Sequence, residues 1–170
     1  MTTPFSFETV FRAPSAEAVL AAYFDPDHLA TQDVVGELTD RKVTEDTDTE
    51  AQRKTSWTVR SIRQLPVFAR PFVEGGRLSY VETMTWRKKD SEIDLTIVPQ
   101  IAGGRVSITA VYNLATIAEG QVRRRYSGDI KVDVKLISGK IERTILSEIE
   151  KGMPMMRDCT QGWLSKKYGA

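Results

Sequence analysis

The feature that most constrains the fold is the last fifty residues, where a long alternating stretch leads into a long helix. Side chains alternate between two faces from residue 121 to residue 136, as expected for a strand. After Ile137-Ser138-Gly139 the spacing becomes helical and continues towards Tyr168. An antiparallel sheet followed by one late helix can curve around that helix and enclose a cavity. We therefore expect a protein that holds an apolar molecule.

The terminal helix is predicted to be kinked. Its apolar side is formed by residues at helical spacing, namely Ile141, Ile145, Ile149, Met153, Met156, Thr160 and Trp163. Gly152 and Pro154 interrupt it. Proline lacks a backbone donor and clashes with the preceding turn, so we expect a kink near residues 150–154. A kinked helix can arch over a concave sheet better than a straight one.

The rest of the chain predicts an α+β fold in one domain, residues 1–170. Alternation at Phe5, Phe7 and Phe11 predicts a first strand. A helix capped by Ser15 ends at Asp25-Pro26, and a second short helix follows through residues 28–30. Six more strands are predicted at roughly 34–46, 51–62, 78–88, 92–102, 105–117 and 121–136. The expected result is a curved antiparallel sheet of about seven strands wrapped around the terminal helix.

Composition excludes several classes of function. The 170 residues include 24 basic and 23 acidic side chains, a net charge of +1, which predicts neither nucleic-acid binding nor attraction to an acidic membrane. One cysteine, Cys159, allows no internal disulfide and no zinc pattern, and no cofactor is expected. The start of the chain lacks the pattern of a secretory signal, and no apolar run suits stable membrane insertion. We expect a cytoplasmic protein.

Turn lengths predict how the strands pair. With a two-residue turn at Gly103-Gly104, Ile97 falls opposite Ala110. The turns near residues 88–91 and 119–120 add Glu82 and Gly128 to the same row. Ala110 and Gly128 carry almost no side chain, so this row is predicted to be the deepest part of the concave face.

Glu82 is the one acid on the apolar face of its predicted strand. A buried carboxylate needs a partner or becomes protonated. If the strand holding Trp57 lies beside it, the indole N–H can donate to Glu82. Two interpretations stay open: Glu82 anchors a ligand or acts as an acid or base, or it is simply satisfied by a structural partner. Arg124 is the other charged residue whose place in the alternation faces inward. It is predicted to extend to solvent, and lining the open end of the cavity is the alternative.

Three other features are given structural roles. His28, the single histidine, is predicted to be a surface or capping residue, since no second histidine or nucleophile motif accompanies it. Cys159 is predicted to be packed in the terminal helix. The connection of residues 64–73 contains two prolines among apolar residues and is predicted to pack over a cavity mouth or a sheet edge. Gating of a ligand entrance is the alternative for this connection.

The order of these elements resembles the helix-grip fold of the SRPBCC superfamily, which includes START lipid-transfer domains, birch-pollen-type allergens and polyketide aromatase/cyclases. Within it, the chain is similar to an uncharacterised, mainly actinobacterial family of unknown function. The similar motifs are Phe24-Asp25-Pro26, Leu65-Pro66, Glu82-Thr83-Met84-Thr85-Trp86 and Leu136-Ile137-Ser138-Gly139-Lys140-Ile141-Glu142. Lys135 and Ser138 stand where we expect proline and glycine. The resemblance implies an apolar cavity between sheet and helix, and no catalytic residues.

The leading functional hypothesis is the binding of a hydrophobic small molecule or lipid in that cavity. The predicted lining residues are Trp57, Tyr80, Glu82, Met84, Ile97, Ala110, Tyr112, Tyr126, Met156 and Trp163. A second hypothesis is a cyclase-, dehydratase- or hydrolase-like enzyme that uses Glu82 as acid or base. A third is a module that binds a protein partner through an exposed apolar patch. A monomer or a weak homodimer is expected.

Overall fold

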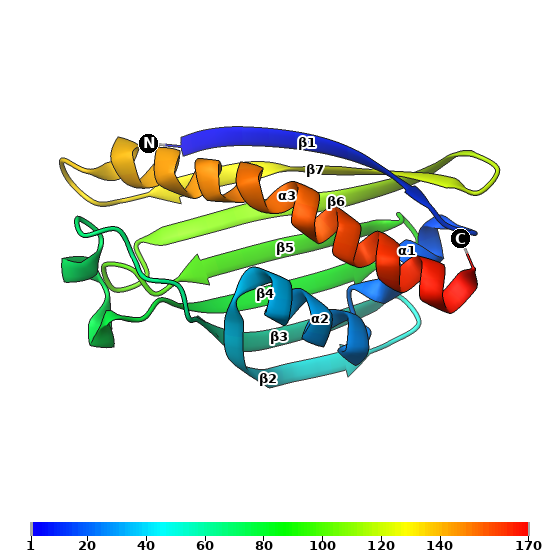
Figure 1. Ribbon diagram of the computed structural model, residues 1–170, viewed down its shortest axis with the longest axis horizontal. Coiled ribbons are helices and arrows are strands. Elements are labelled where there is room, and N and C mark those ends of the chain that lie inside the picture. The colour runs from blue at the N-terminus through cyan, green and yellow to red at the C-terminus, as the bar shows by residue number, and fades with distance from the viewer. Residues whose placement is uncertain (1, 170) are drawn as a thin grey trace.

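A computed structural model describes residues 2–169, which form one seven-stranded antiparallel sheet and three α-helices (Figure 1). The sheet order is β1-β7-β6-β5-β4-β3-β2. The strands are β1 (Thr2–Arg12), β2 (Leu38–Asp48), β3 (Gln52–Ser61), β4 (Ser79–Arg87), β5 (Glu92–Pro99), β6 (Val106–Ala118) and β7 (Gln121–Val132). The helices are α1 (Ala16–Ala22), α2 (Pro26–Gly36) and α3 (Ser138–Tyr168), with short 3₁₀ turns at Arg70–Phe72 and Glu74–Gly76. The predicted α+β architecture, with two short helices after the first strand, is confirmed.

The helix α2 is longer than the sequence predicts. Asp25 accepts hydrogen bonds from the backbone N–H groups of Asp27 and His28, and Pro26 occupies the first turn. These signals start a helix that continues through Val34 and Val35, where a strand was expected. The helix ends because Glu37 adopts a left-handed backbone conformation. Two β-branched residues in a last helical turn therefore mimic the start of a strand.

Two of the three predicted hairpin registers are correct. Glu82 pairs with Ile97 across β4 and β5, and Ala110 pairs with Gly128 across β6 and β7. The register between β5 and β6 is wrong by two residues, because the connection is a six-residue loop over residues 100–105. In that loop the backbone N–H of Ala102 donates to the carbonyl of Phe72, a long-range contact that the Gly-Gly pair does not reveal.

The corrected register divides the predicted row into two rows. Glu82 lies in a row with Trp57, Ile97 and Ile108, which is filled by large side chains. Ala110 and Gly128 belong to the neighbouring row. A Cβ atom at Gly128 would lie 2.6 Å from the Cβ of Ala110, so this glycine permits close approach of two strands rather than opening space.

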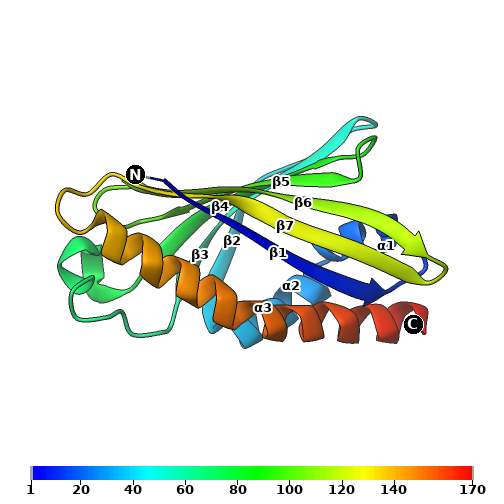
Figure 2. The same cartoon turned by 90° about the horizontal axis from the view of Figure 1, so that it is seen from above.

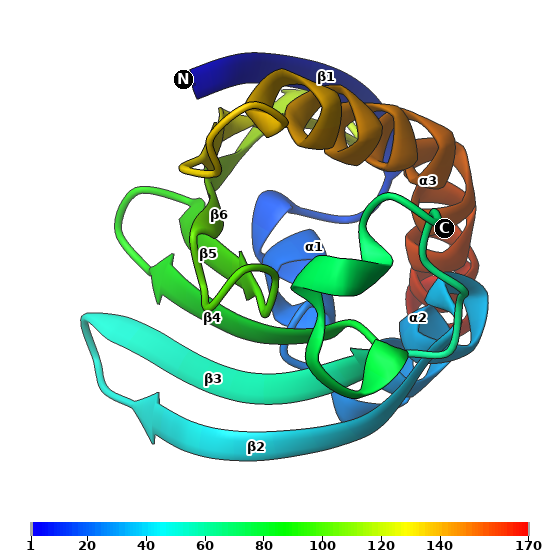
Figure 3. The ribbon, with the colours of Figure 1, turned by 90° about the vertical axis from the view of Figure 1, so that its left-hand side faces the viewer.

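The long helix α3 covers the concave face of the sheet. It is continuous from Ser138 to Tyr168 and contains Pro154, and Figure 2 shows its axis changing direction near the middle. Ile141 near one end and Leu164 near the other are buried against the sheet. Figure 3 shows the sheet curving round below α3, with the β3–β4 connection between them.

None of the helices within residues 2–169 combines the length and the apolar character that crossing a bilayer requires.

Candidate functional site

Glu82 lies on the helix-facing side of the sheet, where its carboxylate accepts a hydrogen bond from an indole. The backbone of β4 pairs Glu82 with Trp57 on β3, and Trp57 Nε1 donates to Glu82 Oε2 over 3.2 Å. The donor predicted from the sequence is therefore present. Burial raises the pKa of Glu82 above its ordinary value, and the charge of Arg41 and the Trp57 hydrogen bond oppose that shift.

A chain of polar contacts holds Trp57 from the other side. The guanidinium carbon of Arg41 lies 4.6 Å from the centre of the Trp57 ring. Arg41 also forms a two-pronged ion pair with Asp33 of α2, with N–O distances of 2.8 Å and 2.6 Å. One connected network therefore joins Asp33, Arg41, Trp57 and Glu82. It holds the Glu82 carboxylate on the side that faces β3.

The neighbours of Glu82 on the inner face keep some accessible surface. Tyr80 and Ile97 on the central strands are partly exposed although they lie on the covered face of the sheet. Tyr112, two strands away, is also partly exposed. On α3 the partly exposed apolar residues include Ile145, Ile149 and Met153. Burial raises the pKa values of Tyr80 and Tyr112, so both phenols stay protonated and able to donate hydrogen bonds.

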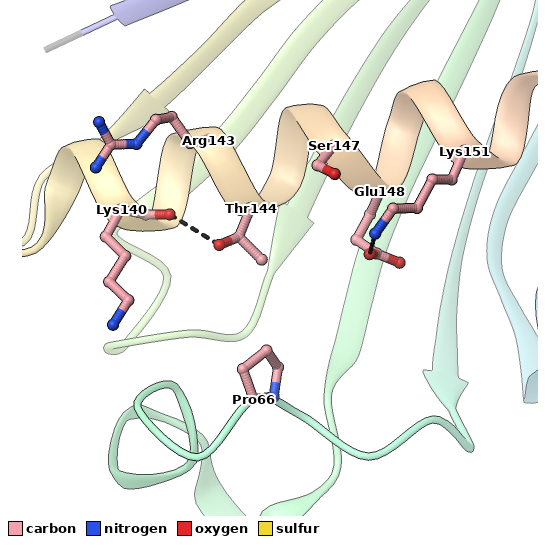
Figure 4. Close-up of a pocket in the computed structure, with 7 residues that line it drawn as sticks. All are labelled: Pro66, Lys140, Arg143, Thr144, Ser147, Glu148 and Lys151. Carbon is pink, nitrogen blue, oxygen red and sulfur yellow. Dashed lines mark hydrogen bonds and ion pairs between the residues drawn. The ribbon is translucent and has the colours of Figure 1, made fainter.

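One pocket of about 400 Å³ lies where the β3–β4 connection approaches α3 (Figure 4). Its wall on the connection is Pro66, and its wall on the helix is Lys140, Arg143, Thr144, Ser147, Glu148 and Lys151. Beside this pocket, the ammonium of Lys140 lies 4.1 Å from the centre of the Phe68 ring. The proline-containing connection therefore packs against α3, in agreement with its predicted packing role.

A second pocket, of about 350 Å³, lies between α2 and the strands β2 and β3. Trp57 lines it together with Phe24, Leu29, Arg41 and Arg53. Of the predicted lining residues, Trp57 borders this pocket and none borders the pocket at Pro66.

Arg124 is buried, which contradicts the predicted extension to solvent. Its side chain is enclosed by aromatic rings, with the guanidinium carbon 5.2 Å from the Phe11 ring centre and 5.0 Å from that of Tyr112. Arg124 Nη1 donates to the hydroxyl of Tyr23, the residue that follows α1. The aromatic faces offset part of the solvation that the guanidinium loses, while its Nε and Nη2 are buried without a hydrogen-bond partner in the part of the chain that the structure describes.

His28 is also buried, so its predicted surface or capping role is wrong. Its Nε2 lies 3.0 Å from the hydroxyl of Thr160 on α3, and its ring packs edge-on against Tyr23 and Trp163. Burial and the nearby Arg124 charge lower the pKa of His28 to about 4. The sequence shows no sign of this contact because Thr160 lies far along the chain. We call this region the closed end of the inner face; it consists of His28, Thr160, Tyr23 and Arg124.

The structure separates the predicted lining residues into groups. Met84 and Ala110 are buried in the row next to that of Glu82, and Tyr126 is buried one row further along. Met156 reaches towards Gly36 of α2, and Trp163 covers His28. The residues that combine inward orientation, accessible surface and proximity to Glu82 in the sheet are Tyr80 and Ile97, whereas Tyr112 lies two rows further along, in the row of Trp86 and Ile93. Within residues 2–169, no three metal-ligating side chains gather into a site.

Solved structures share this fold along nearly the whole chain. TTHA0849 from Thermus thermophilus has a TM-score of 0.66 and 11% identity, covering 98% of this chain and 99% of its own. The ZhuI aromatase/cyclase from Streptomyces sp. R1128 has a TM-score of 0.68 and 11% identity, with coverages of 98% and 96%. Norcoclaurine synthase from Thalictrum flavum, in complex with dopamine and hydroxybenzaldehyde, has a TM-score of 0.64 and 13% identity. The match covers 98% of this chain and 88% of that structure. Such identities show the fold alone.

These structures define the class by its architecture, the helix-grip fold, so the fold that the resemblance in the sequence implied is confirmed. Residues 3–164 match the family DUF2505, described as a protein of unknown function, and the chain belongs to this family. A comparison with curated proteins finds no match.

Proposed function

We propose that this protein binds an apolar small molecule or lipid between the sheet and α3, with Glu82 as its polar anchor. One observation carries the proposal: an inward-facing carboxyl group has one firm partner, Trp57, and adjoins partly exposed Tyr80 and Ile97 on the covered face. An apolar surface with a few orienting polar groups is typical of small-molecule sites. A ligand that carries a hydroxyl, carbonyl or amine group could complete the hydrogen bonding of Glu82.

The entrance in this proposal is the pocket at Pro66. That pocket lies between the β3–β4 connection and the half of α3 that carries Ile145 and Ile149. Displacement of the connection would widen the path to the interior without separating any pair of strands, since these residues belong to no strand. The gating role considered from the sequence is part of this proposal.

Native mass spectrometry of protein purified without denaturation tests the binding proposal. We expect co-purifying apolar molecules, which organic extraction removes and identifies. The Glu82→Gln variant should retain them about tenfold less well, because the neutral amide cannot supply the negative charge with which a carboxylate accepts hydrogen bonds from the ligand. Glu119→Gln is the matched control, since Glu119 lies exposed in the β6–β7 turn. Equal loads in wild-type and Glu82→Gln protein, or none in either, would contradict the proposal.

The raised pKa of Glu82 favours a second function, general acid–base catalysis on a bound substrate. The same fold occurs in an aromatase/cyclase and in norcoclaurine synthase. Catalysis predicts that wild-type and Glu82→Gln protein retain different molecules, related as product and substrate. Identical molecules in both would support binding alone.

A further inference from the structure

The end of the molecule at which α3 begins concentrates positive charge. It is formed by residues 63–78, 100–105 and 133–143, which we call the basic end. These segments hold seven basic and three acidic residues, a net charge of +4, whereas the remaining residues hold 17 basic and 20 acidic ones. The near-neutral total therefore conceals a strong separation of charge.

Contacts within the fold bring the three segments together. The backbone N–H of Ala102 donates to the carbonyl of Phe72, and that of Asp133 donates to the carbonyl of Arg105. Lys140 at the start of α3 lies over the ring of Phe68. Figures 1 and 2 both show these connections at one end of the sheet, and Figure 3 faces them.

Most of these basic side chains have no acidic partner. Within residues 2–169, six exposed ones take part in no ion pair, namely Arg70, Arg77, Arg105, Lys135, Lys140 and Arg143. Of the three acids, Glu142 is buried, which leaves Glu74 and Asp133 at the surface. The outer surface of the basic end therefore attracts anions.

Two apolar side chains protrude among these charges. Leu136 is fully exposed and has a positive φ of 72°, a conformation that is costly for leucine. Val67 is 74% exposed in the β3–β4 connection. Both lie in connections rather than in strands or α-helices. Exposed apolar residues among unpaired basic ones suit the boundary between lipid headgroups and acyl chains.

From this combination we infer that the basic end docks reversibly on a bilayer that contains anionic phospholipids. The basic residues contact the headgroups while Leu136 and Val67 enter the outermost apolar layer. A nucleic acid offers no such apolar layer, and a bilayer offers a continuous one directly beneath its charged headgroups. The docked face includes the pocket at Pro66, so a lipid leaving the bilayer would meet the entrance proposed above. The docking itself does not depend on that ligand site.

Co-sedimentation with vesicles tests the inference. We expect binding to phosphatidylcholine vesicles that contain phosphatidylglycerol, weak binding to pure phosphatidylcholine, and loss of binding as salt increases. The double variant Arg105→Glu and Lys135→Glu should lower the partition coefficient by at least fivefold for each position. Lys89→Glu with Lys166→Glu, exposed residues at the other end of the molecule, should leave it nearly unchanged.

Leu136→Asn separates the apolar contribution from any effect on folding. Asparagine accepts the left-handed conformation more readily than leucine, so the melting temperature should not fall. Binding to anionic vesicles should weaken roughly tenfold because the apolar contact is lost. Equal binding by both charge-reversal pairs, or no vesicle binding by the wild type, would overturn the inference. So would binding to duplex DNA in the absence of vesicle binding.

Discussion

The two charged side chains on the inner face of the sheet occupy opposite kinds of surroundings. Arg124, at the closed end, is 2% exposed and is surrounded by Phe11, Tyr23 and Tyr112. Glu82 has one hydrogen-bond donor, Trp57, and adjoins side chains that keep accessible surface. Aromatic rings enclose the arginine, and within residues 2–169 its buried Nε and Nη2 have no hydrogen-bond partner. The glutamate instead adjoins accessible surface, which leaves room for a further partner.

This contrast shows that inward charge alone does not mark a binding site. A charge enclosed on all sides contributes to packing, and changing it should alter stability. A charge beside accessible surface can meet a ligand, and changing it should alter binding more than stability. The closed end and the Glu82 region should therefore respond differently to matched substitutions.

The largest expected effect on stability is at Arg124. Arg124→Ala leaves a cavity among three aromatic rings and should lower the free energy of unfolding by about 3 kcal/mol, measured by urea denaturation. Arg124→Met keeps much of the volume and should lose less than half as much. Tyr80→Phe, beside Glu82 on the inner face, should change stability by less than about 0.5 kcal/mol. An equal loss in the Ala and Met variants would mean that the charge, rather than the packing, stabilises this region.

His28 makes the closed end sensitive to acid. Its pKa is about 4 in the folded protein and 6.5 in the unfolded chain, so unfolding takes up a proton between these values. The stability due to His28 is complete above pH 6.5 and is lost as the pH falls towards 4. We expect a loss of about 2 kcal/mol between pH 7 and pH 5. His28→Gln should remove this part of the pH dependence in urea titrations at the two pH values.

The contact of His28 with α3 gives a smaller effect. Thr160→Val leaves Nε2 of His28 without its hydroxyl partner and should cost about 1.5 kcal/mol in thermal or urea denaturation. The matched control is Thr144→Val, because the Thr144 hydroxyl donates to the carbonyl of Lys140 within α3. That change should cost less than about 0.5 kcal/mol. Similar losses in both variants would mean that the buried contact adds nothing specific.

Local patterns predicted much of the fold. Alternation located the main strands, helical spacing located α3, and the short turns placed Glu82 beside Ile97 and Ala110 beside Gly128. The donation from Trp57 to Glu82 was expected only on the condition that their strands are neighbours, because the long connection between these strands does not fix the register.

The failures come from contacts between distant parts of the chain. The six-residue β5–β6 loop is held by a hydrogen bond from Ala102 to Phe72, which the glycine pair alone does not indicate. Arg124 is enclosed because α1 places Tyr23 over it, and His28 is buried because α3 places Thr160 beside it. The alternation of side chains along a strand gives the side of the sheet that a residue faces. The elements that cover that side are set by the tertiary fold.

Of the two inward charges, Glu82 has the smaller expected effect on stability, and the sign of that effect depends on pH. Burial raises the pKa of Glu82, so the folded state holds the carboxylate less readily than the unfolded chain does. The contribution of Glu82 to the free energy of unfolding is therefore smaller at pH values above the pKa of the folded state, and it recovers as the pH falls. Glu82→Gln should raise the free energy of unfolding at pH 8, by less than about 1 kcal/mol, and leave it unchanged at pH 4. A destabilised variant at pH 8 would show that Arg41 and Trp57 already satisfy the charge, which would place Glu82 in the same structural category as Arg124.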